Sequence, residues 1–374
     1  MTVDEGERLN KDMILVLEDG AIFHGYSFGS ETSAYGEVVF NTSMVGYQEI
    51  LTDPSYAGQI VVLTYPLIGN YGINDDDVES NRIQVQGFIV RESCSEPSHW
   101  QSQHTLHEYL YEGETPGMYG IDTRALTRRL RSKGVMMGVM TSEKNHQEAL
   151  DWLQGLPQYG NVDFVGEVST PEPYVWQPLS SEPVPNSDVH IVVIDCGLKF
   201  NILRILHRLG CKVTVVPCTF STEDVLELKP DGVLVSPGPG DPAFVDDVAR
   251  SVMGLMNKLP MMGICLGEQI MARALGARTY KLKFGHRGGN HPVREIATGR
   301  VYITAQNHGY AVDADSLHGG LEVSHINLND ETVEGISHRE IPILGIQYHS
   351  EASPGPEDNV YLFNRFLDMV RDHV

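Results

Sequence analysis

The sequence lacks several features that would assign it to a particular class of protein. It has only five cysteines in 374 residues, and no two of them have the CxxC spacing. An odd number of cysteines without paired spacing does not indicate a disulfide framework. No apolar run reaches the roughly 18 residues that a membrane-spanning helix needs, and the polar, acidic residues 1–13 contain no apolar signal region. We therefore expect a cytoplasmic protein.

Positive charge is also scarce. Lysine and arginine number 27 against 50 aspartates and glutamates, which gives a net charge of −23. A polyanion repels nucleic acids and anionic membranes, so neither is expected as a partner. Solubility alone would explain the same charge. The sequence also contains no Gly-x-x-x-x-Gly-Lys-Ser/Thr phosphate loop, so nothing in it predicts nucleotide chemistry on this chain.

The chain is 41% hydrophobic and long enough for two domains with cores of their own. The pattern of residues 1–150 predicts a β-rich α+β domain. A hairpin is predicted where two apolar runs, 14–17 and 21–23, flank Asp19-Gly20. Further strands are expected at 37–41, 59–64, 85–90 and 135–140, and helices at 105–111, 123–132 and 146–156.

Residues 151–188 form the expected connecting segment. Its part 171–187 holds five prolines, which predict an extended linker. Residues 189–374 then alternate between strand and helix. The expected strands are 190–194, 213–216 and 233–235, and the expected helices are 200–209, 222–228 with Thr222 as N-cap, and 248–258. Such alternation predicts an α/β domain with a mainly parallel sheet, in which ligands bind at the carboxyl ends of the strands.

The most informative string is Gly263-Ile264-Cys265-Leu266-Gly267. It lies between an apolar stretch and a helix-like stretch, which is the context of a nucleophile elbow, a sharp strand-to-helix turn that exposes one side chain. The flanking glycines leave room for so tight a turn. The positive end of the following helix dipole favours a thiolate at Cys265. A buried core cysteine between two turn glycines would give the same local string.

A cysteine nucleophile needs a base, and the base needs a group that orients it. His349 and Glu351 are the best candidates, because alternate residues of an extended chain point to the same side. The apolar run 342–346 supplies a strand to carry them. The sequence has 15 histidines, so a chance surface His-x-Glu pair is the competing interpretation.

Acyl chemistry also needs donors for the oxyanion. The backbone N–H of Leu266, directly after the nucleophile, is one candidate. The loop Gly238-Pro239-Gly240, which follows a neighbouring strand, can offer a second. An ordinary strand-to-helix turn would have the same glycines.

These residues together resemble the class I, or triad, glutamine amidotransferases over roughly residues 189–374. Longer strings resemble, more narrowly, the small subunits of carbamoyl phosphate synthetases. The strings that carry this resemblance are Asn41–Tyr56, Thr64–Gly72, Gly120–Arg124, Lys283–Pro292, Asn307–Tyr310 and Glu351–Pro356. They occur in order over nearly the whole chain.

The resemblance implies a class I amidotransferase fold and a glutaminase subunit of a ligase. Such a subunit hydrolyses glutamine through a cysteine thioester and passes ammonia to a large subunit, which makes carbamoyl phosphate from bicarbonate and ATP for arginine and pyrimidine synthesis. Residues 1–150 would dock that large subunit. No cofactor is implied on this chain, and ATP and magnesium are expected on the large subunit.

The resemblance also implies roles for individual residues. Cys265 would be the nucleophile, His349 the general base and acid, and Glu351 the orienting group. Gly238 and Leu266 would hold the oxyanion, and glutamine would be bound by Ser43, Gly240, Gln269, Asn307, Gly309 and Tyr310.

Two residues depart from the family pattern. Glu268 stands where histidine or methionine is usual, and Ser350 where proline is usual. A negative charge at Glu268, within one helical turn of Cys265, would disfavour the thiolate.

His286, His291 and His308 could together form a metal site. No nearby carboxylate or cysteine completes a ligand set, so a structural role in loops is favoured and no metal is expected. Two other functions remain open: a different class I amidotransferase, and a catalytically silent regulatory subunit.

Overall fold

The computed structural model describes residues 11–177 and 189–373, and the chain divides into two compact units, Met1–Val162 and Asp163–Val374. The division places residues 163–177, the later described part of the expected connecting segment, in the second unit. Residues 178–188, which include three of the five linker prolines, lie outside the described residues. Each unit is described by itself.

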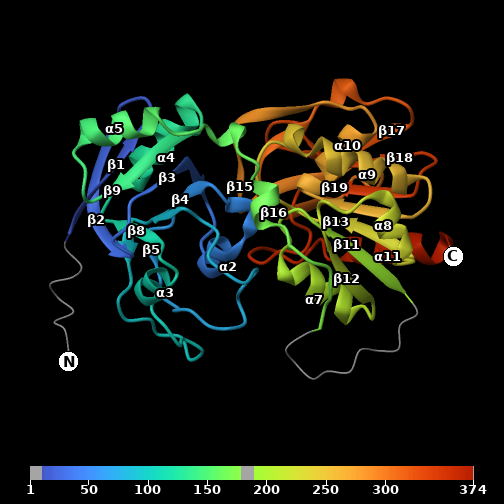
Figure 1. The fold of residues 1–374 in the computed structure, drawn as a ribbon, viewed down its shortest axis with the longest axis horizontal. Coiled ribbons are helices and arrows are strands. Elements are labelled where there is room, and N and C mark those ends of the chain that lie inside the picture. The colour runs from blue at the N-terminus through green and yellow to red at the C-terminus, as the bar shows by residue number, and fades with distance from the viewer. Residues whose placement is uncertain (1–10, 178–188, 374) are drawn as a thin grey trace. The chain divides into compact units, whose positions relative to one another are not determined.

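The first unit is a closed barrel (Figure 1). Its strands follow each other around the barrel in the order β1, β2, β8, β6, β4, β3, β9. Their bounds are β1 Asp12–Leu17, β2 Ile22–Gly29, β3 Ala34–Asn41, β4 Gln59–Leu63, β6 Gly87–Ile89, β8 Pro116–Tyr119 and β9 Met136–Thr141, and β5 Leu67–Ile68 pairs with β7 Glu92–Ser93 outside the barrel. The predicted hairpin is confirmed, since β1 and β2 pair antiparallel with Val16 opposite Ile22.

The helices of this unit are α2 Tyr47–Thr52, α3 Leu106–Glu112, α4 Thr123–Lys133 and α5 His146–Gln154. The three long ones were expected from the apolar spacing. A core cluster joins the barrel to α2 and α3, with Phe28, Val39 and Phe88 from strands and Ile50 and Leu106 from helices. Burial of this apolar area holds α2 and α3 against the barrel.

The second unit is built on a ten-stranded sheet in the order β10, β12, β11, β13, β14, β19, β18, β17, β15, β16. The bounds are β10 Tyr174–Val175, β11 His190–Asp195, β12 Lys212–Pro217, β13 Gly232–Val235, β14 Met261–Ile264, β15 Thr279–Glu295, β16 Val301–Val312, β17 Leu321–Asn327, β18 Val333–His338 and β19 Ile343–Ile346. Strands β12, β11, β13, β14 and β19 run parallel, as the alternation of strand and helix predicted.

Beyond β19 the sheet is antiparallel, which the sequence pattern had not indicated. Short connections join β15 to β18, and only antiparallel neighbours can be joined without a crossover helix. The α/β class holds, and the parallel half of the sheet carries an antiparallel extension.

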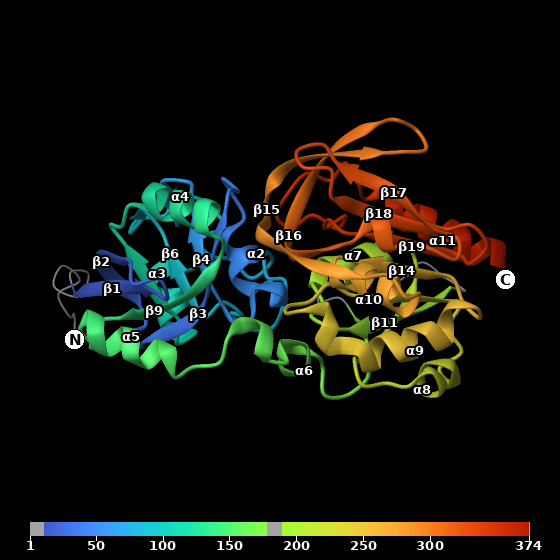
Figure 2. The same cartoon turned by 90° about the horizontal axis from the view of Figure 1, so that it is seen from above.

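Helices cover both faces of the parallel strands (Figure 2). They are α6 Phe164–Val168, α7 Phe200–Arg208, α8 Thr222–Glu227, α9 Asp246–Met256, α10 Leu266–Ala274 and α11 Tyr361–His373. Alternate residues of β11 point to opposite sides: Val192 packs in the cluster with α9 and α10, and Val193 in the cluster with α7 and α11. A strand buried on both faces has the continuous apolar sequence seen here.

Two local predictions need correction. The N-cap of α8 is Ser221, not Thr222, because the Ser221 hydroxyl accepts from the Asp224 N–H and the Asp224 carboxylate accepts in return from the Ser221 N–H. The proline-rich segment is not only a linker: its residues Tyr174 and Val175 form β10, which pairs antiparallel with β12 at the sheet edge.

Candidate active site

Cys265 lies at the carboxyl end of β14 and is the N-cap of α10. Its backbone has φ 55° and ψ −108°, a conformation that residues other than glycine rarely adopt. The turn is held by the Cys265 N–H, which donates to the carbonyl of Ile346 on the adjacent strand β19 at 2.8 Å. Strain of this kind persists only where the surrounding structure enforces it, and it is common at functional sites.

Close packing explains the glycines on either side of this turn. A Cβ on Gly263 would lie 2.5 Å from the sulfur of Met271 and 2.6 Å from the carbonyl carbon of Gly267. A Cβ on Gly267 would overlap the carbonyl oxygen of Val235. Neither glycine is required for a positive φ, so the elbow needs them for space, as the sequence argument proposed.

His349 and Glu351 lie side by side after β19. The Nδ1 of His349 is 2.6 Å from Oε1 of Glu351, and both side chains are buried. The extended chain expected here is not present. The backbone turns instead, with the Ala352 N–H donating to the His349 carbonyl at 3.1 Å, and the turn brings the two side chains together.

A buried lysine that the sequence analysis missed completes this group. The Nζ of Lys199 lies 3.0 Å from Oε1 of Glu351 and donates to the carbonyl of Ala352 at 2.7 Å, while only 2% of the Lys199 side chain is exposed. Lys199 precedes α7, just beyond the carboxyl end of β11. That position was the available signal, since the carboxyl ends of the parallel strands meet at one edge of the sheet.

The charges of this group are strongly coupled. Burial lowers the pKa of His349, but the Glu351 carboxylate outweighs burial and the Lys199 ammonium and raises the pKa to about 10. Burial raises the pKa of Glu351, but Lys199 and His349 lower it to about 2. The Nε2 of His349 has no hydrogen-bond partner among the described residues, and the Cys265 thiol is one of the groups that raise the pKa of His349. The ring therefore offers its second nitrogen toward the sulfur.

Two further groups contact the sulfur. The Cys265 thiol donates to the backbone carbonyl of Asn307, and the side-chain amide of Gln347 donates to the sulfur, each at 3.6 Å. The Gln269 amide in turn donates to Oε1 of Gln347 at 2.8 Å and to the carbonyl of Tyr310 at 2.9 Å. The sequence analysis missed Gln347, although it stands two residues before His349.

Gly238 and Leu266 lie at the carboxyl ends of the adjacent strands β13 and β14. A Cβ on Gly238 would overlap the carbonyl of Cys196 and lie 2.8 Å from Cδ2 of Leu266, so this loop can come so close only with glycine. Gly240 has φ 89°, in the left-handed region that favours glycine. The loop is therefore more constrained than an ordinary turn.

The remaining expected glutamine contacts come from two units. Asn307, Gly309 and Tyr310 lie on β16, near Cys265 and Gln269 through the contacts given above. Ser43 belongs to the first unit, between β3 and α2, where its N–H donates to the Asn41 side chain at 2.7 Å. The expectation that Ser43 reaches the glutamine site stays a prediction.

Burial disfavours the charge that the sequence argument gave Glu268. Its side chain is fully buried and neither carboxyl oxygen has a hydrogen-bond partner among the described residues. Burial, and then the charge of Glu334, raise the pKa of Glu268 well above its usual value. The neutral acid is favoured, so the argument that a charge disfavours the thiolate loses its premise. Ser350 is also buried, and its hydroxyl has no partner among the described residues.

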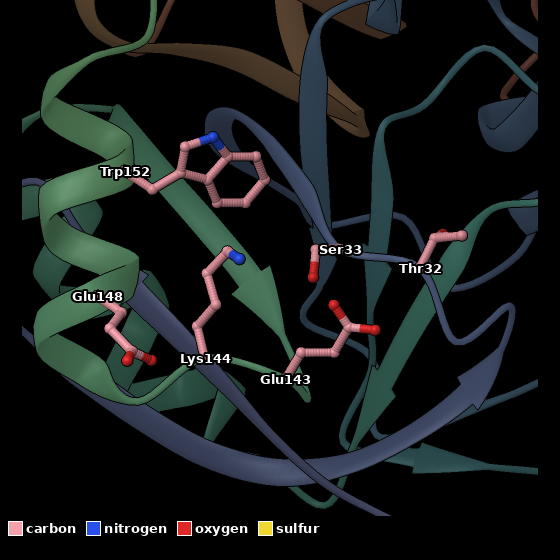
Figure 3. A pocket seen from close by; sticks show the side chains of 6 residues that line it. All are labelled: Thr32, Ser33, Glu143, Lys144, Glu148 and Trp152. Carbon is pink, nitrogen blue, oxygen red and sulfur yellow. The ribbon is translucent and has the colours of Figure 1, made fainter.

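A separate pocket of about 780 Å³ lies in the first unit (Figure 3). It is lined by Thr32, Ser33, Glu143, Lys144, Glu148 and Trp152. The Lys144 ammonium lies 5.4 Å from the centre of the Trp152 ring. None of the expected site residues lines this pocket, so the candidate active site remains the group around Cys265.

Two family models match the chain. The model described as carbamoyl-phosphate synthase small chain, CPSase domain, matches residues 15–140, and the model described as glutamine amidotransferase class-I matches residues 192–369. The second match contains Cys265, His349 and Glu351.

Proteins named carbamoyl phosphate synthase small chain are similar to this chain over nearly its whole length. The one from Solidesulfovibrio magneticus is 50% identical over 368 residues, which are 96% of this chain and 98% of the relative. The one from Aquifex aeolicus is 50% identical over 97% of this chain and 100% of its own length. The one from Listeria monocytogenes serotype 4b is 52% identical over 96% of each chain. Within residues 11–177 and 189–373, no helix combines the length and apolar character needed to cross a bilayer.

Proposed function

The chain belongs to the family of carbamoyl phosphate synthase small chains, and we propose that it releases ammonia from glutamine at Cys265 for use by a large subunit. The observation that carries this proposal is the buried arrangement of Cys265 at a strained strand-to-helix turn, with the His349–Glu351 pair bonded at 2.6 Å beside it. A nucleophile, a base and an orienting carboxylate are the groups that acyl transfer requires.

The reaction proceeds in two steps. His349 takes the proton of the Cys265 thiol as the sulfur attacks the side-chain amide carbon of glutamine. His349 then gives this proton to the departing nitrogen, so the C–N bond breaks and ammonia leaves a glutamyl thioester. His349 then takes a proton from water as the water oxygen attacks the thioester carbon. The C–S bond breaks, His349 returns the proton to the sulfur, glutamate leaves, and the thiol is restored. Glu351 holds the imidazole through Nδ1, and Lys199 balances the carboxylate.

Backbone donors stabilise the tetrahedral intermediates of both steps. The N–H groups of Gly238 and Leu266, at the ends of neighbouring strands, are proposed to bind the oxyanion. Ser43, Gly240, Gln269, Asn307, Gly309 and Tyr310 are proposed to hold the rest of the glutamine molecule. Because the Gln269 amide nitrogen already donates to Tyr310 and Gln347, its oxygen is the atom that we assign to the substrate ammonium group.

The proposal also includes a partner subunit and a cellular location. Ammonia at neutral pH is mostly ammonium, which is not a nucleophile, so direct transfer to a docked large subunit avoids its loss. The first unit is the proposed docking surface, and ATP and magnesium act on the large subunit. The net charge of −23 supports the proposal that the chain binds neither nucleic acid nor membrane. We also propose that it works in the cytoplasm.

Removal of one sulfur tests the function. Cys265→Ser in the complex with the large subunit should abolish glutamine-dependent carbamoyl phosphate synthesis and leave ammonia-dependent synthesis intact. Cys94→Ser is the matched control, because Cys94 is a half-buried thiol of the first unit whose sulfur donates to the Glu96 carbonyl. Glutamine-dependent activity that survives in Cys265→Ser would overturn the proposal. A chain with no activity even before substitution would indicate a regulatory subunit.

A further inference from the structure

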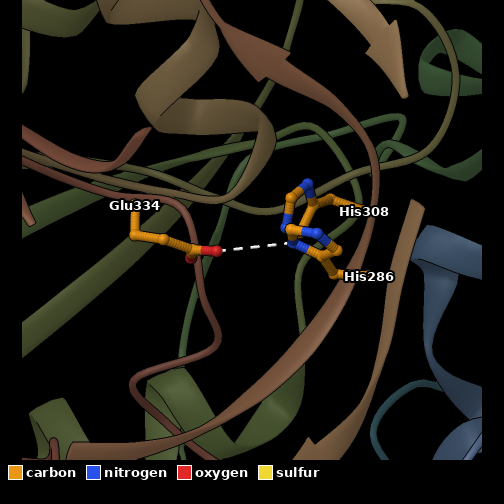
Figure 4. A group of neighbouring side chains, drawn as sticks. All are labelled: His286, His308 and Glu334. Carbon is orange, nitrogen blue, oxygen red and sulfur yellow. Dashed lines mark ion pairs between the residues drawn. The ribbon is translucent and has the colours of Figure 1, made fainter. Parts of the chain in front are cut away.

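Three buried side chains from separate strands of the second unit converge (Figure 4). They are His286 of β15, His308 of β16 and Glu334 of β18, and one possible ligand atom from each lies within 4.8 Å of the other two. The side chains are 6%, 5% and 0% exposed. Because buried ionisable groups are costly unless they are paired or bind a metal, this convergence needs an explanation.

The outer nitrogen of each histidine is already bonded. His286 Nε2 lies 2.8 Å from the Asp330 carboxylate, and its Nδ1 lies 3.4 Å from Oε1 of Glu334. His308 Nδ1 lies 2.7 Å from the carbonyl of Tyr310. A carbonyl only accepts, so Nδ1 of His308 carries the proton and Nε2 keeps its lone pair. Metal-binding histidines almost always have this arrangement, with the remaining N–H held by a carboxylate or a backbone carbonyl.

One of the three inner atoms has no hydrogen-bond partner in the parts of the chain that the structure describes, whereas Nδ1 of His286 also lies 3.5 Å from the Asn327 side-chain nitrogen. Nε2 of His308 has no hydrogen-bond partner among the described residues. Because the Tyr310 carbonyl holds the proton on Nδ1, the lone pair of Nε2 is directed into the cluster with no donor among these residues to accept from.

Hydrogen bonds also fix the orientation of Glu334. Gln306 donates to its Oε2 at 2.8 Å, and Asn327 donates to its Oε1 at 2.7 Å. A carboxylate oxygen has more than one lone pair, so Oε1 can still bind a cation. The carboxylate that the sequence analysis did not find for this histidine set is therefore supplied by β18, far along the chain.

We propose that Nδ1 of His286, Nε2 of His308 and Oε1 of Glu334 bind one divalent transition-metal ion of the zinc class. Two imidazoles and one carboxylate suit zinc and its neighbours, whereas magnesium and calcium prefer all-oxygen sites. Zinc bonds to such atoms are about 2.0–2.2 Å long. The three ligand atoms lie within 4.8 Å of one another, so they must move closer together when the ion binds. His291, whose ring centre is 5.1 Å from that of His286 and whose Nδ1 lacks a partner among the described residues, is a further donor beside the set.

The ion would join β15, β16 and β18, which are not all neighbours in the sheet. His308 lies between Asn307 and Gly309, so the ion would also fix the strand segment assigned to glutamine. This consequence rests on the proposed function, but the metal site itself does not.

A proton is the competing occupant. Burial lowers the pKa of His286, but its hydrogen bonds to Asp330 and Glu334 raise it to about 9. An imidazolium paired with the two carboxylates would therefore also satisfy much of the cluster. The two occupants exclude each other, and direct metal binding decides between them.

The test uses the purified full chain, stripped with a chelator and titrated with zinc by calorimetry. We expect one ion per chain. His308→Asn and Glu334→Gln should lose that binding, and Asp330→Asn, which only orients His286, should weaken it about 10- to 100-fold. His318→Asn is the matched control, because His318 is an exposed histidine whose Nδ1 also lies near a backbone carbonyl, that of Ser316 at 2.9 Å; it should bind like the unsubstituted chain.

Cobalt gives a readout that needs no variant. Bound to the unsubstituted chain, Co²⁺ should show the intense visible bands of a low-coordinate site. A chain that binds less than one zinc per molecule and shows no such bands would overturn the proposal, and the cluster would then be an imidazolium ion pair. Stoichiometric binding that persists in both His308→Asn and Glu334→Gln would overturn it equally, because the ion would lie elsewhere.

Discussion

The second unit contains two buried histidine–glutamate pairs with different surroundings. In one, His349 bonds Glu351 at 2.6 Å, and Lys199 lies 3.0 Å from the same carboxylate oxygen. In the other, His286 lies 3.4 Å from Glu334 and 2.8 Å from Asp330. Both glutamates are fully buried.

The neighbours of each pair determine its chemistry. Lys199 balances the charge of Glu351, so His349 is held by one nitrogen and turns the other toward a thiol. The amides of Gln306 and Asn327 donate to Glu334. His286 lies 3.4 Å from the same carboxylate, and a nitrogen of His308 lies within 4.8 Å of it. We therefore propose that the same two residue types serve proton transfer in one place and cation binding in the other. The predictions below separate the two pairs.

The largest effect should come from removing the base. His349→Asn should lower glutamine-dependent turnover by roughly 100- to 10,000-fold, which is the usual contribution of general acid–base catalysis. His286→Asn should cost less than this, because His286 is not in contact with the sulfur. Steady-state rates of the complex with glutamine, compared with rates with free ammonia, measure both. A loss in His286→Asn as large as that in His349→Asn would remove the distinction between the pairs.

The next effect concerns stability. Lys199→Met leaves the buried Glu351 carboxylate without its ammonium partner, and breaking a buried ion pair in this way typically costs about 3–5 kcal/mol. Urea unfolding gives the free energy. The double variant Lys199→Met with Glu351→Gln is the control, since a neutral partner should restore much of the loss. If the double variant is less stable by the sum of the two single losses, the two groups are not coupled.

An effect spread over several pH units should appear in the pH dependence of stability. The pKa of folded His349 is raised to about 10, above the value of roughly 6.5 in an unfolded chain. Its contribution is therefore complete below that lower value and is lost as pH rises through about 10. Stability should fall across this range by up to about 1.4 kcal/mol per pH unit for one proton. Urea unfolding between neutral and alkaline pH should show a shallower fall in His349→Asn than in His318→Asn, and equal slopes would contradict the assignment.

The smallest effect is expected at Glu268. Because burial favours its neutral form, Glu268→Gln replaces an uncharged acid with an amide of nearly the same shape. Glutamine-dependent rate and the pH profile of Cys265 alkylation should both change little. A clear shift of the alkylation profile would show that Glu268 is ionised and acts on the thiol after all.

Part of the fold followed directly from local patterns. The hairpin at Asp19-Gly20, the α/β alternation after residue 189 and the long helices follow from apolar spacing and turn residues, which act over a few neighbours. The antiparallel half of the sheet and strand β10 did not follow, because pairing between distant strands leaves no periodic signal in either one. Ser221 was missed as a cap because two adjacent hydroxyl residues fit the same N-cap pattern.

The residues around Cys265 show the same limit of prediction from local patterns. His349 and Glu351 are two residues apart, and Cys265 lies in a glycine-flanked turn, so the sequence alone made all three candidates. Lys199 and Gln347 were missed, since neither stands in a motif and each acquires a role only through burial against a partner.

The sequence by itself determined the elbow, the catalytic candidates and the family, because each depends on short strings whose geometry the local backbone enforces. Only the tertiary structure decided both the burial that shifts the charge states and the convergence of His286, His308 and Glu334. Whether Glu268 is neutral depends on its full burial next to Glu334, and burial is a property of the packed chain. Likewise His286, His308 and Glu334 are separated by many residues and meet only because β15, β16 and β18 belong to one sheet.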